Sequence, residues 1–155
     1  MTMTIRPATA RDLSGLLALY AEFHPDDVPL PIEDAHLIWA DIATQRGRTV
    51  LVADLDGMVA GTADCAVLPN LTRGGHPIMF VENVVVASTH RRRGIGRRLL
   101  VAAGTVAADA GCYKVQLLSA DSAEVLAFYR ACGFEGESAQ GFRRYLRGSA
   151  SGNAR

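Results

Sequence analysis

Residues 78–97 of this chain read IMFVENVVVASTHRRRGIGR. The first nine residues, Ile78–Val86, are almost continuously apolar, which is expected of a strand buried on both faces. Apolar side chains then recur at helical spacing from residue 95 to residue 110, and Gly111 ends the pattern. A polar, basic turn joins the two segments. The stretch therefore predicts a buried strand that leads through a basic turn into a long amphipathic helix.

The basic turn combines three features of an anion-binding site. Backbone N–H groups at the start of a helix have no intrahelical partner and lie at the positive end of the helix dipole. Glycines let a phosphate approach the backbone without meeting a Cβ atom, and the flanking arginines add positive charge. The residues expected to contribute are Arg91, Arg92, Arg93, Gly94, Ile95, Gly96 and Arg97. The turn is thus predicted to hold a phosphate or diphosphate.

Other phosphate motifs fit this turn poorly. A dinucleotide fingerprint would need a third glycine where Leu99 stands, and a P-loop would need Lys-Ser or Lys-Thr after a second glycine. A solvated basic turn and a nucleic-acid patch remain open as alternatives. The chain carries 16 basic and 16 acidic residues, and this balance argues against a general nucleic-acid binder.

Periodicity and turn residues predict the elements of the remaining chain. The pair Asp56-Gly57 is typical of a tight hairpin turn. Strands are expected at 4–8, 50–53, 58–68 and 114–118, with one or two more within 134–146, and further helices are expected at 12–24, 33–45 and 122–131. The strand–helix–strand order of the second half favours a partly parallel sheet with crossover helices.

The chain has 155 residues, of which 49% are hydrophobic and 21% are charged. This composition excludes a disordered protein, because enough apolar surface is available to form a core. The length supports a single domain, expected at residues 4–147 and followed by a flexible tail at 148–155. No apolar run approaches the roughly 20 residues of a membrane helix, and no secretory leader is recognisable. We therefore expect a cytoplasmic protein without membrane contact.

The spacing of cysteines and histidines shows no metal-binding pattern. Cys65, Cys112 and Cys132 form no CxxC pair, which fits a reducing compartment. The four histidines lack the i, i+4 spacing that places two imidazoles on one helix face. We therefore expect no bound metal. Cys112 and Cys132 are expected to be small buried hydrophobes, with a nucleophilic cysteine as the alternative.

Three ordered motifs resemble one known family. The motifs are Glu82-Asn-Val-Val-Val86, Arg91-x-x-Gly94-x-Gly96 and Phe128-Tyr129-Arg-Ala-Cys-Gly133-Phe134. Together they resemble the GNAT superfamily of acetyl-CoA-dependent N-acetyltransferases, and residues 111–117 are similar to the branch that contains glucosamine-phosphate N-acetyltransferases. The resemblance implies an α/β (α+β) fold: a mixed, mostly antiparallel sheet of about six or seven strands, with a splayed parallel central pair and flanking helices.

The resemblance also implies acetyl-CoA as the co-substrate. In this family the strand that corresponds to Val84, Val85 and Val86 splays from its parallel neighbour, and the pantetheine arm of the cofactor hydrogen-bonds the exposed strand backbone. The diphosphate then lies on the N–H groups of residues 92–97. Ser122 stands where many relatives carry an asparagine that binds the cofactor arm. A cofactor contact from Ser122 is therefore one expectation, and a simple N-cap role is the other.

Acetyl transfer to an amine needs a base and benefits from a proton donor to the leaving thiolate. The resemblance places Glu82 as the base, directly or through water, and we expect it to be buried; a solvent-facing or structural Glu82 is the alternative. An N–H group near Val84 would stabilise the tetrahedral intermediate. Tyr129 matches the family tyrosine that donates the proton, and a purely structural core aromatic is its alternative interpretation.

The expected acceptor is a small molecule whose primary amine attacks the thioester directly in a ternary complex. Its site is predicted in the loop between the first two helices, where His24, Asp26 and Asp27 could attract a cation. The C-terminal strands would complete it, with Arg143 and Arg144 available to an acidic group. The sequence does not choose among amino sugars, aminoglycosides, polyamines, amino acids and protein N-termini.

Two other functions stay open at this point. One is a non-catalytic acyl-CoA binding or sensing module on the same fold, and the other is nucleic-acid binding through residues 91–93. Stabilisation by CoA is expected of both the enzyme and the sensor, but only the enzyme releases thiol when an amine is present. A nucleic-acid complex would weaken steeply with salt. Because many family members form dimers through their C-terminal strands, we also expect a homodimer that uses Phe142 or Tyr145.

Overall fold

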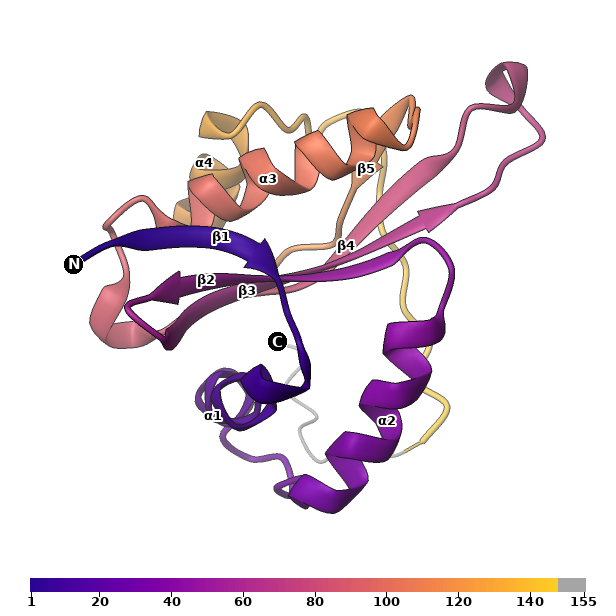
Figure 1. Ribbon diagram of the computed structural model, residues 1–155. Helices are drawn as coiled ribbons and strands as arrows, with labels where there is room; N and C mark the ends of the chain where they lie inside the picture. The colour runs from indigo at the N-terminus through magenta and orange to yellow at the C-terminus, as the bar shows by residue number, and fades with distance from the viewer. Residues whose placement is uncertain (148–155) are drawn as a thin grey trace.

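Residues 1–147 are described by a computed structural model, in which a sheet lies between two layers of helices (Figure 1). The strands are β1 (Met3–Pro7), β2 (Arg48–Leu55), β3 (Met58–Leu68), β4 (Ile78–Val86) and β5 (Lys114–Gln116). The helices are α1 (Leu13–Phe23), α2 (Ile32–Thr44), α3 (Ile95–Asp109) and α4 (Ala123–Ala131). Short 3-10 turns lie at Ala10–Asp12, Arg73–Gly75 and Ser88–His90.

The sheet has the order β1-β2-β3-β4-β5. The first four strands pair antiparallel, and β5 pairs parallel with β4. In Figure 1, α1 and α2 lie on one side of the sheet, and α3 and α4 lie on the other. This arrangement confirms the mixed, mostly antiparallel α/β fold. None of the helices within residues 1–147 is long and apolar enough to cross a membrane.

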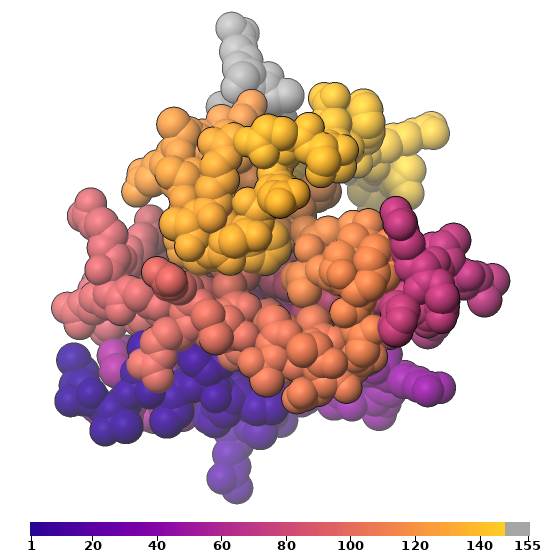
Figure 2. Space-filling view, turned by 90° about the horizontal axis from the view of Figure 1, so that it is seen from above, coloured from indigo at the N-terminus to yellow at the C-terminus, as the bar shows by residue number. Residues whose placement is uncertain are grey.

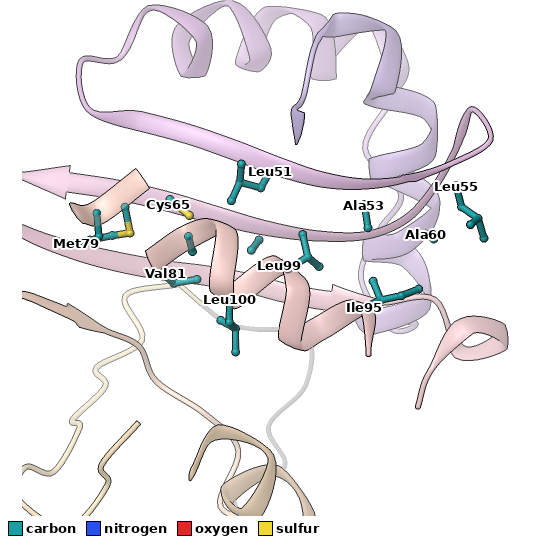
Figure 3. Packing of buried hydrophobic residues seen from close by; sticks show 13 residues of the cluster. Leu51, Ala53, Leu55, Ala60, Cys65, Met79, Val81, Ile95, Leu99 and Leu100 are labelled. Atoms are coloured by element: carbon teal, nitrogen blue, oxygen red, sulfur yellow. The ribbon is translucent and has the colours of Figure 1, made fainter. Parts of the chain in front are cut away.

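The main core lies between the sheet and α3. Apolar side chains from β2, β3, β4 and α3 form one cluster (Figure 3), in which Met79, Val81 and Leu99 are at most 1% exposed. Burial of a side chain of this size stabilises the fold by about 1.5–3 kcal/mol. A smaller cluster joins α1 to the opposite face of the sheet through Leu16 and Val52. Helices therefore cover both faces, which explains the nearly continuous apolar sequence of β4.

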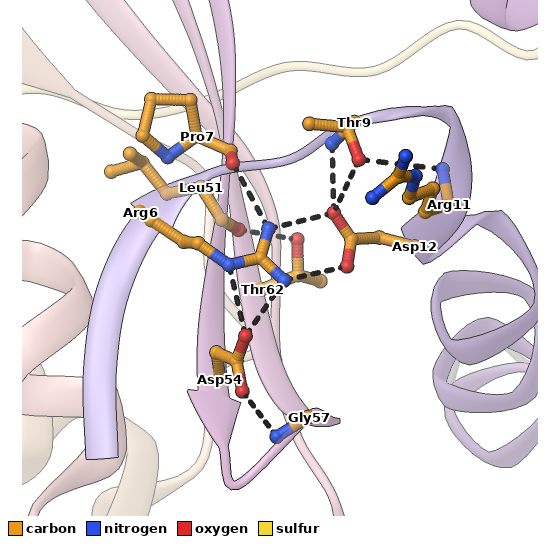
Figure 4. Close-up of polar contacts among 9 residues, drawn as sticks. All are labelled: Arg6, Pro7, Thr9, Arg11, Asp12, Leu51, Asp54, Gly57 and Thr62. Atoms are coloured by element: carbon orange, nitrogen blue, oxygen red, sulfur yellow. Dashed lines mark hydrogen bonds and ion pairs between the residues drawn. The ribbon is translucent and has the colours of Figure 1, made fainter. Parts of the chain in front are cut away.

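Arg6 connects the first strand to the start of α1 and to β2. Its guanidinium donates two hydrogen bonds of 2.8 Å to Asp12 and two, of 2.9 and 2.8 Å, to Asp54 (Figure 4). The buried Asp12 also accepts a 2.7 Å hydrogen bond from the N–H of Thr9, as part of a capping box. The hydrogen bonds from Arg6 lower the pKa of Asp12, against the opposing effect of burial. This network sets the position from which α1 begins.

A β-bulge interrupts β4 at Asn83. Thr62 pairs with Val85 and Asp64 pairs with Glu82, so two residues of β4 lie opposite the single β3 residue in between. The φ angle of Asn83 is 51°, in the left-handed region that asparagine adopts more readily than most residues. An extra residue of this kind bends a strand and increases its twist.

The bulge shifts the alternation of side chains along β4 by one residue. Met79 and Val81 precede it, Val84 and Val86 follow it, and all four pack in the cluster under α3. Val85 is 4% exposed and lies on the other face of the sheet, the one covered by α1. Odd-numbered residues of β4 therefore face α3 before the bulge, and even-numbered residues face it after the bulge.

β4 and β5 separate after three residue pairs. Ile78–Phe80 pairs with Lys114–Gln116, and the ladder then ends. Residues 81–86 have β3 on one side and, within the described chain, no strand on the other. The predicted splayed parallel pair is thus confirmed, although it lies at the edge of the sheet and not at its centre.

The strands predicted within 134–146 are not formed. The sheet in residues 1–147 therefore has five strands instead of the six or seven expected, and β5 ends at Gln116, before the predicted residue 118. Residues 135–141 read EGESAQG, and glycine and acidic residues are disfavoured in strands. They also pair with no strand edge in the described chain. The tail predicted at 148–155 lies outside the described residues.

Candidate functional site

The basic turn joins the end of β4 to α3, as predicted. Gly94 is the N-cap of α3 with a φ of 76°, and Arg92 also has a positive φ, of 58°. The first helical hydrogen bond runs from the N–H of Arg98 to the carbonyl of Gly94, at 3.0 Å. The N–H groups of residues 95–97 therefore have no partner within the helix. Together with the positive end of the helix dipole, they form an anion-binding surface.

Two hydrogen bonds anchor this turn to its neighbours. The Nε of Arg91 donates to the carbonyl of Val86 at 3.2 Å, and the N–H of Ser88 donates to Oε1 of Glu22 at 2.8 Å. The hydrogen bonds from Ser88 lower the pKa of Glu22. The turn is thereby held against both β4 and the end of α1. All four arginines of the turn are exposed.

The two glycines of the turn have different roles. A Cβ atom at Gly96 would lie 3.0 Å from Cζ of Phe128 and 3.7 Å from Cγ2 of Val86. Glycine therefore lets the first turn of α3 approach α4 closely. A Cβ atom at Gly94 would meet nothing within 4 Å, so this glycine is required for its left-handed backbone. Both glycines were predicted to allow access to a phosphate, and the sequence did not indicate the packing role of Gly96.

Tyr129 lies in α4, half-buried among aromatic side chains. Its ring makes edge-to-face contacts with Phe128 and Phe134, at centroid distances of 5.0 and 5.8 Å. Burial raises the pKa of its hydroxyl, and Cys132 and Glu82 raise it further. The phenol is therefore protonated at neutral pH and can donate a proton.

A cleft of about 1250 Å³ lies beside Tyr129. It is bounded by α3, α4, β5 and residues 134–145, and its walls include Leu100 and Leu118. Figure 2 looks onto this side of the molecule, where the described C-terminal residues lie next to α3. Of the residues predicted for catalysis and acceptor binding, Tyr129 and Arg143 line the cleft, whereas the basic turn lies outside it; Cys132 and Tyr145 line it as well. The cleft and the turn therefore flank α4 as two separate features.

Glu82 is exposed, so the burial expected of it is not found. The cause is the splay, because β5 does not extend beside this part of β4 to cover it. Glu82 lies opposite Asp64 of β3, and paired residues of an antiparallel ladder share one face of the sheet. This is the face covered by α1 and α2. Any group that reaches Glu82 from that side meets an accessible carboxylate.

An ion pair that was not predicted from the sequence lies next to Glu82. The Nε and Nη2 of Arg48 donate to the two carboxylate oxygens of Asp64, at 2.9 and 2.5 Å. Asp64 is buried, with 7% of its side chain exposed. The ring of Tyr20 packs nearby, and burial raises the pKa of its hydroxyl. These residues belong to no motif and come from different elements, so no local signal in the sequence could have shown the pair.

Ser122 is the N-cap of α4. Its Oγ accepts a hydrogen bond from the N–H of Val125 at 3.4 Å, which is the geometry of the capping alternative. The predicted acceptor-loop residues His24, Asp26 and Asp27 are exposed between α1 and α2, and the arginines at 143 and 144 are exposed as well. Within residues 1–147, no group of three or more His, Cys, Asp or Glu side chains is placed to hold a metal ion.

Comparison with known proteins identifies one family. A model described as the acetyltransferase (GNAT) family matches residues 13–134. The chain is similar to glucosamine 6-phosphate N-acetyltransferase of Trypanosoma brucei brucei, with 32% identity over 143 residues that cover 89% of this chain and 92% of the relative. It is also similar to glucosamine 6-phosphate N-acetyltransferase 1 of Oryza sativa subsp. japonica, with 31% identity over 140 residues, 88% of this chain and 83% of the relative.

A solved structure agrees with this comparison. The chain resembles an acetyltransferase from Trypanosoma brucei with a TM-score of 0.81 and 30% sequence identity, and the match covers 94% of this chain and all of that structure (100%). The similarity therefore extends over the helices and strands that form the splay, the basic turn and α4.

Proposed function

Because the chain belongs to the acetyltransferase (GNAT) family and is an acetyl-CoA-dependent N-acetyltransferase, we propose that a primary amine of its acceptor attacks acetyl-CoA directly within a ternary complex. The observation that carries this proposal is the edge of β4 beyond Phe80, which has no partner strand within the described chain. The end of this edge lies next to the start of α3, with its free amides, and next to α4, the helix that carries Tyr129. Since the relatives are glucosamine 6-phosphate N-acetyltransferases, the acceptor is proposed to be a small molecule.

The residues of the splay and of the basic turn fit coenzyme A. The backbone of Val84–Val86 lacks a strand on one side within the described chain, so its N–H and C=O groups can bind the amides of a pantetheine arm as they would bind another strand. The amides of residues 95–97 and the exposed arginines of the turn can hold a diphosphate. When bound, acetyl-CoA supplies an activated thioester carbonyl.

Glu82 is the proposed general base. Its carboxylate takes a proton from the ammonium group of the acceptor, directly or through one water, and the neutral nitrogen then forms a bond to the carbonyl carbon. The exposure of Glu82 allows an amine to reach it from the face covered by α1 and α2. A backbone N–H of the bulged segment near Val84 is proposed to stabilise the negative oxygen of the intermediate.

Tyr129 is the proposed general acid. As the carbon–sulfur bond breaks, its hydroxyl donates a proton to the departing sulfur. The attacking nitrogen releases its second proton to solvent, and Tyr129 regains a proton from solvent, so one proton is released overall when Glu82 gives up the proton it took. The raised pKa keeps the hydroxyl protonated until this step. The overall reaction converts an amine and a thioester into an amide and a thiol, with no change in oxidation state.

Thiol release from acetyl-CoA, measured with a panel of primary amines, tests this proposal. We expect at least one amine to release thiol, and Glu82→Gln to lower kcat by about a hundredfold or more. The matched control Glu33→Gln, on the exposed first turn of α2, should stay within about twofold of the wild-type rate. A hundredfold excess of CoA over its Kd should stabilise each protein by about 2.7 kcal/mol. Stabilisation by CoA without thiol release from any amine would contradict acetyl transfer.

We also propose that the C-terminal segment forms a homodimer contact. Phe142, Tyr145 and Leu146 are 85%, 70% and 87% exposed, and they follow Gly141, which lies against Leu118 just after β5. The outer edge of β5 has no partner strand within residues 1–147, and open edges tend to pair with other chains. Sedimentation of the wild type and of Phe142→Asp tests the proposal; a wild type that stays monomeric at micromolar concentration contradicts it.

A further inference from the structure

A second cavity is lined by residues of α1, α2 and the sheet. These two helices lie on the face of the sheet opposite α3 (Figure 1). Its volume is about 150 Å³, and most of its walls are apolar side chains, among them Leu17, Leu30, Ile38 and Trp39. An apolar protein cavity of about 150 Å³ holds one benzene molecule. The cavity therefore has room for a single six-membered ring or for a branched alkyl group of similar size.

The charged groups of this cavity already neutralise each other. Arg48 and Asp64 both reach its wall, where Arg48 donates to both carboxylate oxygens. The remaining terminal nitrogen of Arg48, Nη1, donates to Oε1 of Gln45 at 3.0 Å. Among the described residues that line the cavity, there is consequently no cation left to bind an anionic group.

Asn83 connects the cavity to the reacting strand. It is the bulge residue between Glu82 and Val84, and it also lines the cavity. A ligand that fills the apolar part with its body would present its other end at Asn83. That end lies one residue from the proposed base and one residue from the proposed oxyanion donor. The cavity is thus placed to deliver an amine, and it is built to hold an apolar body.

We propose that this cavity holds the body of the acceptor, and that the acceptor is a compact primary amine with one aromatic ring or a branched alkyl group. The inference rests on the acetyl transfer proposed above. A sugar phosphate does not fit this cavity, because its charge would be buried against Leu17 and Trp39 without a free cation. Its hydroxyl groups would also lose hydrogen bonds to water and would meet few polar partners among the mostly apolar walls. The proposed acceptor therefore belongs to a different chemical class from glucosamine 6-phosphate, the acceptor in the names of the relatives.

Steady-state thiol release by the wild type gives the first test. The amines are 2-phenylethylamine, isoamylamine, glucosamine and glucosamine 6-phosphate, each with saturating acetyl-CoA. We expect kcat/KM for 2-phenylethylamine to exceed that for glucosamine 6-phosphate by about a hundredfold, since a mostly apolar site without a free cation disfavours a charged, polar ligand. A higher kcat/KM for either sugar than for both apolar amines would overturn the inference.

Two adjacent residues of α2 provide a matched pair of variants. Ile38 lines the cavity and is 47% exposed, whereas Leu37 is 71% exposed and does not line it. Ile38→Lys should lower kcat/KM for 2-phenylethylamine by about tenfold or more, mainly through KM, because it places a charge beside the apolar body. Leu37→Lys should stay within about twofold. Both variants should retain the thermal stabilisation by CoA, which verifies their folding.

The outcomes separate this inference from the proposed function. Thiol release that is equally insensitive to Ile38→Lys and Leu37→Lys overturns the cavity assignment and leaves acetyl transfer intact. Absence of thiol release with every amine, in a wild type that CoA stabilises, contradicts acetyl transfer itself and the inference with it.

Discussion

Glu82 lies directly opposite Asp64 in the antiparallel ladder of β3 and β4. Side chains at such positions have Cβ atoms about 4.5–5.5 Å apart. Two carboxylates therefore lie side by side on the face of the sheet covered by α1 and α2. Arg48 binds both oxygens of Asp64 and neutralises it. The charge that β3 presents to Glu82 therefore depends on Arg48.

Replacement of Arg48 by glutamine should destabilise the fold by about 2–3 kcal/mol, because the buried carboxylate of Asp64 then loses both hydrogen bonds from Arg48. The double variant Arg48→Gln, Asp64→Asn removes the unpaired carboxylate and should be more stable than the single variant. Urea unfolding of the three proteins measures both effects. A single variant as stable as the wild type would contradict the prediction.

Tyr129→Phe should lower kcat by about ten- to a hundredfold, near the small end of general acid catalysis, because a thiol is already a fair leaving group. Tyr113→Phe is the matched control, since Tyr113 is exposed and contacts Arg73 and Lys114 instead. The raised pKa of Tyr129 keeps its acidic form to higher pH than usual. The wild-type rate should therefore not fall until the pH exceeds about 10, the ordinary tyrosine value. An unchanged rate in Tyr129→Phe would remove the proton-donor role.

Arg6→Gln should destabilise the fold by about 2–3 kcal/mol, because Asp12 stays buried without its partner. This loss of stability is smaller than that expected for a fully buried ion pair, because Arg6 is partly exposed. The lowered pKa of Asp12 also has a pH signature. Stability from this pair is present above the unfolded carboxyl pKa and is lost as the pH falls through the lower folded value. Urea unfolding at neutral and acid pH should therefore show a smaller acid loss in Arg6→Gln than in the wild type. Equal losses would contradict the prediction.

Gly94→Ala and Gly104→Ala should have opposite effects although both lie at or in α3. Gly94 has a φ of 76°, which costs a residue with a Cβ atom about 1–2 kcal/mol. Gly104 is exposed within the helix and a Cβ atom there meets nothing within 4 Å, so alanine should stabilise by about 0.5–1 kcal/mol. Urea midpoints measure both effects. Destabilisation of similar size by the two variants would show that the Gly94 conformation is not the cause.

Cys65 should not react with thiol reagents in the folded protein. It is fully buried, and burial raises the pKa of its thiol to about 12, so almost no thiolate is present at pH 8. Cys112 and Cys132 are partly exposed and should react first. Mass spectrometry after brief alkylation, with and without urea, measures this order. Rapid alkylation of Cys65 in the native protein would contradict the packing of β3 under α3.

Elements with a strong local signal were predicted well. The pair Asp56-Gly57 predicted a hairpin, and the structure has positive φ angles of 51° and 89° there, with Leu55 paired to Met58. These angles suit the twist of the flanking strands. The segment 78–86 and the helix that follows it were also predicted closely, because a buried strand and an amphipathic helix each impose a pattern that extends over many residues.

The incorrect predictions concern pairing between distant segments. A strand within 134–146 needs an edge to pair with, and the sequence of that segment does not reveal whether one is available. The exposure of Glu82 depends on where β5 ends, which is likewise a property of the pair and not of either strand. Ion pairs such as Arg48 with Asp64 depend on the register of β2 and β3. The motif residues were therefore predictable, whereas their surroundings were not.

The extra residue at Asn83 decides which positions of β4 are useful for redesign. Counting every second residue from Met79 would assign Val85 to the layer beneath α3, but it faces the side from which the amine is proposed to enter. Variation at Val85 therefore alters the surroundings of the amine, whereas variation at Val84 or Val86 disturbs the packing of α3. In a homologous strand that lacks the additional residue, the side chains after this point would face the opposite side of the sheet, even where the amino acids are the same.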